Sequence, residues 1–295
     1  MGRDDAFPIG CYGKLPFWPE YIEHLATTPA ASAFKRWIEA GRAEASLEQA
    51  GEVRERARLR FLMTNPSSPE SLVGVMRPSQ DAARRSHPFA VFIRLPRRDH
   101  AGRFAALALG LAPIWEALDD AWEALAGSPS PGVFSDLRRS FAIPPPRPLP
   151  ELVAELKAGL GDRAGSILAG GGQGRVATTL AALAAGARDP AERVRPPVLV
   201  PVSEDARRAC RDLAFWIDLV DRQFMWRRPE PTIFATAAVD GLITSASLLF
   251  GPLCPHDYRL VLESPDRRGE AGQDAVESDR SVPTYAELLA MRTRR

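Results

Sequence analysis

The sequence predicts an α/β fold, with a mixed central sheet and helices packed on both of its faces. Segments typical of strands are interspersed along the whole chain with segments whose apolar residues recur at the three- to four-residue spacing of helices. Proline is also frequent, at 27 of 295 residues, nearly twice its usual share of ~5%. This abundance indicates many short elements that are separated by fixed turns.

Helices are predicted where the apolar spacing is accompanied by capping residues, proline in the first turn or glycine beyond the end. They are residues 28–56, 99–127, 151–160 and 203–224. Strands are predicted where apolar residues alternate with polar ones, or run together, between turn residues. They are residues 59–63, 72–76, 90–93, 166–169, 197–201, 233–238, 246–250 and 258–262. The first two of these strands predict a β-hairpin.

A proline-rich stretch at residues 144–150 predicts a stiff polyproline II connector and divides the chain. We expect an N-terminal region at residues 1–143. Residues 144–263 are expected to form a second α/β region that packs on the same sheet or forms a closely joined subdomain. Residues 264–295 are predicted to be a polar tail with a short terminal helix.

Composition argues against several classes of partner. The 38 basic residues are offset by 37 acidic ones, and the net charge of +1 attracts neither nucleic acid nor an anionic membrane. No stretch approaches the ~20 apolar residues that a membrane span needs, so no insertion is expected. The three cysteines are widely separated and the start of the chain does not resemble a signal peptide, which favours a cytoplasmic location.

Residues 10–21, GCYGKLPFWPEY, have the composition of one rigid loop. The glycines allow left-handed or closely packed backbone, and the prolines restrict their own and the preceding residues. Phe17 and Trp18 supply aromatic surface, while Lys14 and Glu20 carry the charge of the loop. We therefore expect a fixed, specific structure that is not a helix.

A second loop is predicted at residues 78–88, between two strands. It contains Asp81, Arg85 and His87. An ion pair between Asp81 and Arg85 would brace the turn, or these side chains would take part in recognising a partner, and both interpretations stay open.

Together the two stretches resemble the TagF family, also called ImpM, of bacterial type VI secretion. The first resembles its signature of glycine, tyrosine, glycine, lysine, leucine and proline, although Pro19 and Glu20 stand where that family usually has glycine and aspartate. The second is similar to its pattern of proline, serine, a variable residue and aspartate, followed by arginine and proline. Here Ala82 and Arg84 replace a usual basic residue and a usual glycine. The resemblance covers residues 7–95.

This resemblance implies a non-enzymatic, cytoplasmic accessory protein that represses secretion assembly after translation. It also implies a protein partner, a forkhead-associated scaffold protein of the secretion system. A structural subunit of the apparatus is an alternative role. We expect no cofactor, no metal and no small-molecule substrate. Because aromatic residues and arginine dominate interaction hot spots, the candidate partner-binding residues are those of the two loops: Lys14, Phe17, Trp18, Glu20, Asp81 and Arg85.

The competing hypothesis is a hydrolase or a nucleotide-binding enzyme. It would use His87 with Asp81 and Arg85, or the glycine-rich stretch that begins with Gly170 and ends with Gly174. That stretch lacks the lysine and Ser or Thr of a P-loop, and the chain has no Gly-x-Ser-x-Gly elbow. The run Cys-Pro-His-Asp at residues 254–257 resembles half of a metal site, but without a second Cys or His pair it falls short of a tetrahedral zinc site.

Overall fold

The computed structural model describes residues 7–49, 58–65, 67–130, 134, 143–170, 179, 182–183, 197–224, 231–238 and 241–263. The strands are β1 (Ile9–Gly13), β2 (Ile22–His24), β3 (Arg58–Met63), β4 (Glu70–Arg77), β5 (Phe89–Pro96), β6 (Val198–Val200), β7 (Thr232–Ala237) and β8 (Ile243–Leu249). The α-helices are α1 (Pro29–Gln49), α2 (Phe104–Leu109), α3 (Ala112–Ala126), α5 (Leu149–Gly170), α7 (Ala206–Phe224) and α8 (Pro255–Glu263).

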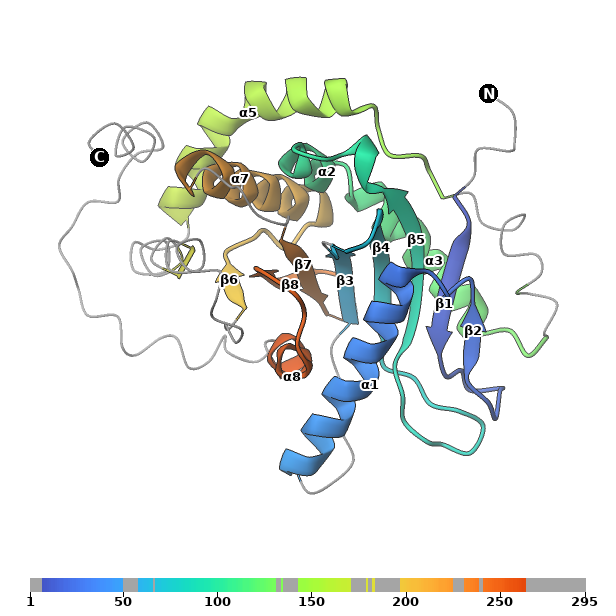
Figure 1. Ribbon diagram of the computed structural model, residues 1–295. Coiled ribbons are helices and arrows are strands. Elements are labelled where there is room, and N and C mark those ends of the chain that lie inside the picture. Colours follow the sequence, from blue (N-terminus) through green and yellow to red (C-terminus); the bar gives the residue numbers. More distant parts are fainter. Residues whose placement is uncertain are drawn as a thin grey trace.

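The strands form one sheet in the order β2-β1-β5-β4-β3-β7-β8-β6 (Figure 1). Every pair of neighbouring strands in this order is antiparallel, so the predicted mixture of parallel and antiparallel pairs is wrong. Two parallel strands can be neighbours only if a crossover segment connects them. Helix α1 is such a segment, but the strands that it connects, β2 and β3, are separated in the sheet by β1, β5 and β4. β7 pairs with β3, so residues from both predicted regions contribute to the same sheet. The boundary between those regions stays a prediction.

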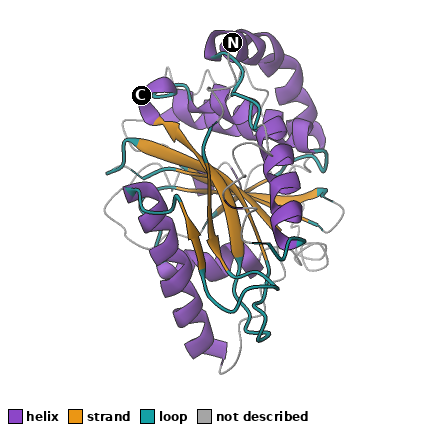
Figure 2. Ribbon diagram, turned by 90° about the vertical axis from the view of Figure 1, so that its right-hand side faces the viewer, coloured by secondary structure: helices purple, strands orange, loops and turns teal. Residues whose placement is uncertain are grey.

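Helices cover both faces of the sheet, which confirms the predicted α/β architecture (Figures 1 and 2). The helices α2, α3, α5 and α7 share a core with one face of the strands. The helices α1 and α8 share a second core with the other face. The largest fully buried side chains include Trp115 and Trp216 on the first face and Phe34 on the second. Within the described ranges, none of the helices has both the length and the apolar character needed to cross a membrane.

Helix α1 begins as the sequence predicts. Thr28 caps it, with its hydroxyl oxygen 3.4 Å from the backbone nitrogen of Ala31, and Pro29 is its first residue. Farther along the helix, a Cβ added to Gly41 would lie 2.2 Å from the Cβ of Tyr258 on α8. Glycine is therefore what allows α1 and α8 to pack this closely.

Two helix predictions need correction. The stretch at residues 99–127 forms α2 and α3 rather than one helix, because α2 ends at Leu109 with Gly110 as its C-cap and Pro113 lies in the first turn of α3. Proline lacks the N–H that a continuous helix would use and suits a first turn. The cap of α7 is Asp205, whose carboxylate accepts from the backbone N–H of Arg208 at 2.9 Å, and not Ser203.

Two predicted strands are helical instead. Residues 166–169 lie in α5, which continues past Gly161, the residue that predicts an earlier end. Residues 258–262 lie in α8. That helix has Pro255 in its first turn, and the carboxylate of Asp257 accepts from the N–H of Cys254 at 2.7 Å. In both places a short apolar run fits a strand or a buried helix equally well, and periodicity cannot separate them.

Candidate protein-interaction surface

The two loops predicted from the sequence meet at the carboxylate of Asp81. Its Oδ1 accepts from the backbone N–H groups of Ala83 and Arg85, at 2.9 and 2.8 Å. Its Oδ2 accepts from Nζ of Lys14 at 2.8 Å and from Nε of Arg85 at 2.6 Å. Burial of the Asp81 carboxyl acts to raise its pKa, but the hydrogen bonds from Lys14 and Arg85 outweigh it and hold the pKa well below its usual range. Asp81 is therefore ionised and fixed on both oxygens.

Two further contacts join the loops. Nη2 of Arg85 donates to the carbonyl oxygen of Pro19 at 2.7 Å. The backbone N–H of Ala82 donates to the carbonyl oxygen of Trp18 at 3.2 Å. Residues 14–21 and 78–88 therefore form one unit, which we call the paired loops.

The paired loops contribute Tyr21 and His87 to an aromatic cluster with Tyr12 of β1. The rings of Tyr12 and Tyr21 are stacked with centroids 6.0 Å apart, and His87 packs edge-on against both. The ammonium of Lys14 lies 4.8 Å from the centroid of the Tyr21 ring, within the range of a cation–π contact. The ammonium of Lys14 therefore contacts both the carboxylate of Asp81 and the ring of Tyr21.

His87 is buried in this cluster and neutral at physiological pH. Its Nδ1 lies 2.7 Å from the carbonyl oxygen of Pro88, to which it donates a hydrogen bond. Burial lowers the pKa of His87 to about 4, against the weak opposing effect of the Pro88 bond, and the charges of Arg42 and Lys14 lower it further.

The outer surface of the paired loops carries exposed aromatic side chains. Phe17 and Tyr21 are each 52% exposed. Trp18 is half-buried and packs edge-on against Phe134, with ring centroids 5.6 Å apart. Arg85 is exposed as well. Aromatic groups held on a fixed backbone suit protein recognition, because little conformational entropy is lost when they bind.

Positive φ angles occur at Gly13, directly before the first of the paired loops, and at Arg84 in the second. Gly13 has φ of 131°, and a Cβ there would lie 2.0 Å from the carbonyl oxygen of Pro88, so only glycine fits. Arg84 has φ of 60°, a left-handed conformation that also favours glycine. TagF proteins usually have glycine at this position, where this chain has arginine. The left-handed backbone explains that preference for glycine.

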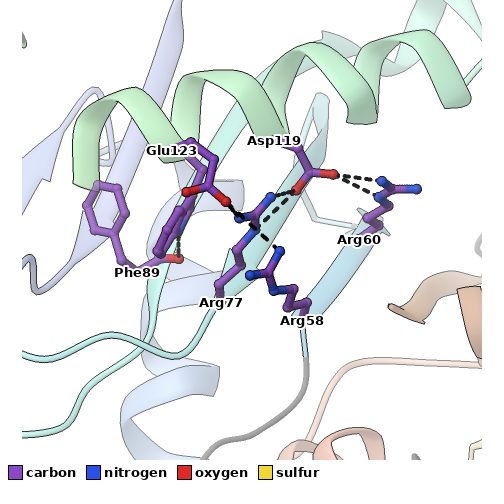
Figure 3. A network of polar contacts seen from close by, with 7 residues as sticks. Arg58, Arg60, Arg77, Phe89, Asp119 and Glu123 are labelled. Carbon is purple, nitrogen blue, oxygen red and sulfur yellow. Dashed lines mark hydrogen bonds and ion pairs between the residues drawn. The ribbon is translucent and has the colours of Figure 1, made fainter. Parts of the chain in front are cut away.

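A second polar cluster lies on the face of the sheet that α3 covers (Figure 3). Asp119 accepts from Nη2 of Arg60 at 2.8 Å and from Nη2 of Arg77 at 2.5 Å. Glu123, one turn farther along α3, pairs with Arg77 and lies 3.9 Å from Nη1 of Arg58. The arginines belong to β3 and β4, so these ion pairs join a helix to the strands beneath it.

This cluster supports the base of the paired loops. Arg77 ends β4 and Phe89 begins β5, directly before and after residues 78–88. The indole N–H of Trp122 on α3 donates to the carbonyl oxygen of Phe89 at 2.8 Å, and the Arg77 guanidinium lies 4.8 Å from the Trp122 ring centroid. Helix α3 therefore holds both strand ends from which the second loop emerges.

Two of the six candidate partner-binding residues lie inside this assembly. Lys14 and Asp81 are buried, at 5% and 1% exposure, so they position the loops rather than touch a partner. The exposed candidates are Phe17, Glu20 and Arg85, and Trp18 is half-buried. The expected contact between Asp81 and Arg85 does brace the turn.

The residues of the competing hypothesis have other contacts. His87 makes its side-chain hydrogen bond to Pro88, and Asp81 is engaged on both oxygens. Gly170 is the last residue of α5, and residues 171–174 lie outside the described residues. Asp257 caps α8. Among the residues that the structure describes, no three His, Cys, Asp or Glu side chains gather as a metal site would require.

Residues 10–131 match a family described as the TagF N-terminal domain, Type VI secretion system-associated. This part of the chain is a TagF N-terminal domain. The resemblance seen in the sequence is confirmed, and both the paired loops and the cluster on α3 lie within the TagF N-terminal domain. The crystal structure of PA0076 from Pseudomonas aeruginosa PAO1 is similar to this chain, with a TM-score of 0.49 and 14% identity, covering 93% of this chain and 100% of that one. No curated protein matches the chain.

Sequence reasoning missed three features of the TagF N-terminal domain. Tyr12 and Tyr21 lie in the resemblance itself, but nothing in their spacing indicated that they would stack around His87. The left-handed conformation of Arg84 was signalled by the glycine usual at that position. The ion pairs of α3 were signalled by Asp119 and Glu123, which are four residues apart and so share one helix face.

Proposed function

We propose that this TagF protein is a non-enzymatic, cytoplasmic accessory protein that represses assembly of the type VI secretion system by protein contact. Its contact surface is the outer face of the paired loops, with Phe17 and Tyr21 as hydrophobic anchors and Arg85 beside them. The partner is a forkhead-associated scaffold protein of the same system, as the resemblance implies.

The observation that carries this proposal is the way in which the paired loops are held. A buried carboxylate fixes Lys14 and Arg85, and the exposed aromatic side chains extend from the backbone that these contacts hold in place. A surface that is ordered before binding loses less conformational entropy on association. Exposed aromatic side chains on such a backbone are typical of interaction hot spots.

Contact fits the chemistry of the paired loops better than catalysis does. A general base needs a free lone pair within reach of a substrate proton, but four donors already occupy the two oxygens of Asp81. His87 is buried at 3% exposure. Neither group is placed to meet a substrate without rearrangement of the loops.

The first experiment measures binding of the purified scaffold protein to the wild type and to Phe17→Ala. Removing an exposed hot-spot aromatic group is expected to weaken binding about tenfold, which corresponds to ~1.4 kcal/mol. The Tm is expected to stay unchanged, because the ring is half exposed. Leu199→Ala is the matched control, since Leu199 is 40% exposed on the opposite edge strand, β6.

The second experiment deletes the gene and follows secretion under resting and activating conditions. We expect increased secretion at rest, restored to normal by the wild-type gene and by Leu199→Ala but not by Phe17→Ala. Unchanged secretion under both conditions would contradict the repressor role. Reduced secretion would indicate a structural subunit instead.

A further inference from the structure

We infer that Arg84 and Arg85 bind carboxylate side chains, so that the paired loops receive an acidic segment of the partner protein. This inference rests on the proposed function, because it names the chemistry of the partner at the same surface. The two adjacent arginines differ: Arg84 has a left-handed backbone conformation, and the side chain of Arg85 is fixed by two hydrogen bonds.

Arg84 occupies a conformation that is unfavourable for its residue type. Its φ of 60° places the Cβ close to the following carbonyl oxygen, which costs every residue except glycine. Arg84 is exposed, and the described part of the chain offers its guanidinium no hydrogen-bond or ion-pair partner. Nothing within the described molecule therefore offsets the strain of placing arginine here. Backbone outliers of this kind are often associated with function.

The guanidinium of Arg85 is held in place by hydrogen bonds, but part of it is free to bind a further acceptor. Its Nε donates to Asp81 and its Nη2 to the carbonyl oxygen of Pro19, while its side chain is still 60% exposed. No acceptor for Nη1 is present among the residues that the structure describes. Because two bonds already fix the guanidinium, a carboxylate that binds its free edge would cost little side-chain entropy.

The charges of the paired loops complement an acidic partner. Lys14, Arg84 and Arg85 supply three positive charges, against Glu20 and Asp81. Asp81 is buried and already binds two of the cations, so its charge is not available at the surface. His87, the other titratable group of the second loop, is buried and neutral. The exposed side of residues 78–88 therefore carries only the charges of Arg84 and Arg85.

The test uses the full chain and a fluorescently labelled peptide of ten glutamates, with binding followed by fluorescence anisotropy. Arg84→Asn removes the charge but tolerates the left-handed conformation, and Arg84→Lys keeps the charge. Arg98→Asn is the matched control, since Arg98 is 87% exposed beyond the far end of β5. We expect Arg84→Asn to weaken binding about fivefold, with Arg84→Lys and Arg98→Asn close to the wild type. Raising the salt concentration to about 0.5 M should abolish the difference, because it screens exposed charges.

Equal affinities for the wild type, Arg84→Asn and Arg98→Asn, or no binding by the wild type, would overturn the inference. The same variants are then measured against the scaffold protein. If Phe17→Ala weakens scaffold binding and Arg84→Asn does not, the proposed function stands and the acidic partner is wrong. If the scaffold does not bind at all while the peptide result holds, the scaffold is the wrong partner and the acidic recognition stands.

Discussion

The buried imidazole of His87 should make the protein lose stability in mild acid. The folded pKa lies at about 4, compared with an ordinary value of 6.5, so the folded state favours the neutral ring. The unfolded chain binds a proton first as the pH falls. The stabilisation is therefore complete above about pH 6.5 and is lost as the pH falls toward 4.

The size of the effect follows from the two pKa values. The full difference of about 2.5 pKa units corresponds to ~3 kcal/mol at 1.36 kcal/mol per unit. At pH 5, where the unfolded residue is mostly protonated and the folded one is not, about 2 kcal/mol should already be lost relative to pH 8. Protonation would place a charge beside the rings of Tyr12 and Tyr21, where the charges of Lys14 and Arg42 also act on it.

The assay is urea unfolding between pH 8 and pH 5 for the wild type and for His87→Phe, which keeps an aromatic ring but cannot titrate. The variant is expected to lose about 2 kcal/mol less free energy of unfolding than the wild type over this range. Asp81 does not interfere, because its pKa is lowered in the folded state, so its stabilising contribution is lost only as the pH falls through its ordinary value of 3.8 and lower, outside the range of the assay. Equal pH dependence in the two proteins would refute the argument that His87 is buried as the neutral form.

Two further predictions concern packing and the cluster on α3. Gly41→Ala should lower the free energy of unfolding by about 2 kcal/mol, because its Cβ would overlap Tyr258, whereas Gly159→Ala in α5 meets nothing within 4 Å and should be neutral or stabilising. A neutral result at Gly41 would mean that α1 and α8 are not packed so closely. Asp119→Ala should cost about 3 kcal/mol, because it removes the only carboxylate paired with buried Arg60 among the described residues and leaves buried Arg77 with Glu123 alone, while Asp120→Ala on the exposed side of α3 should change stability by less than about 0.5 kcal/mol. Equal effects at the two positions would contradict the importance of these ion pairs.

The α/β architecture could be predicted because the local signals agree with the final fold. Thr28 and Pro29 begin α1, and the apolar spacing of α3 places Trp115 in the core. The strand predicted at residues 258–262 failed because a five-residue apolar run has no period long enough to define it. Asp257, which caps helix α8 there, belongs to the Cys-Pro-His-Asp run that resembles half of a metal site.

The candidate site was predictable in part for a different reason. Glycine permits left-handed or closely packed backbone and proline restricts φ, so the sequence could locate both loops of the site. Which side chains stay exposed depends on contacts between segments about 65 residues apart, such as that between Lys14 and Asp81. Local patterns carry no information on such contacts, and Lys14 and Asp81 were therefore placed among the surface candidates although they are buried.

Hydrogen exchange of the full chain, with and without the forkhead-associated scaffold protein, tests most directly whether the paired loops are the recognition surface. We expect the scaffold to protect amides in residues 14–21 and 78–88 together, because the two segments form one unit. Protection confined to other segments, or to only one of these two, would contradict it.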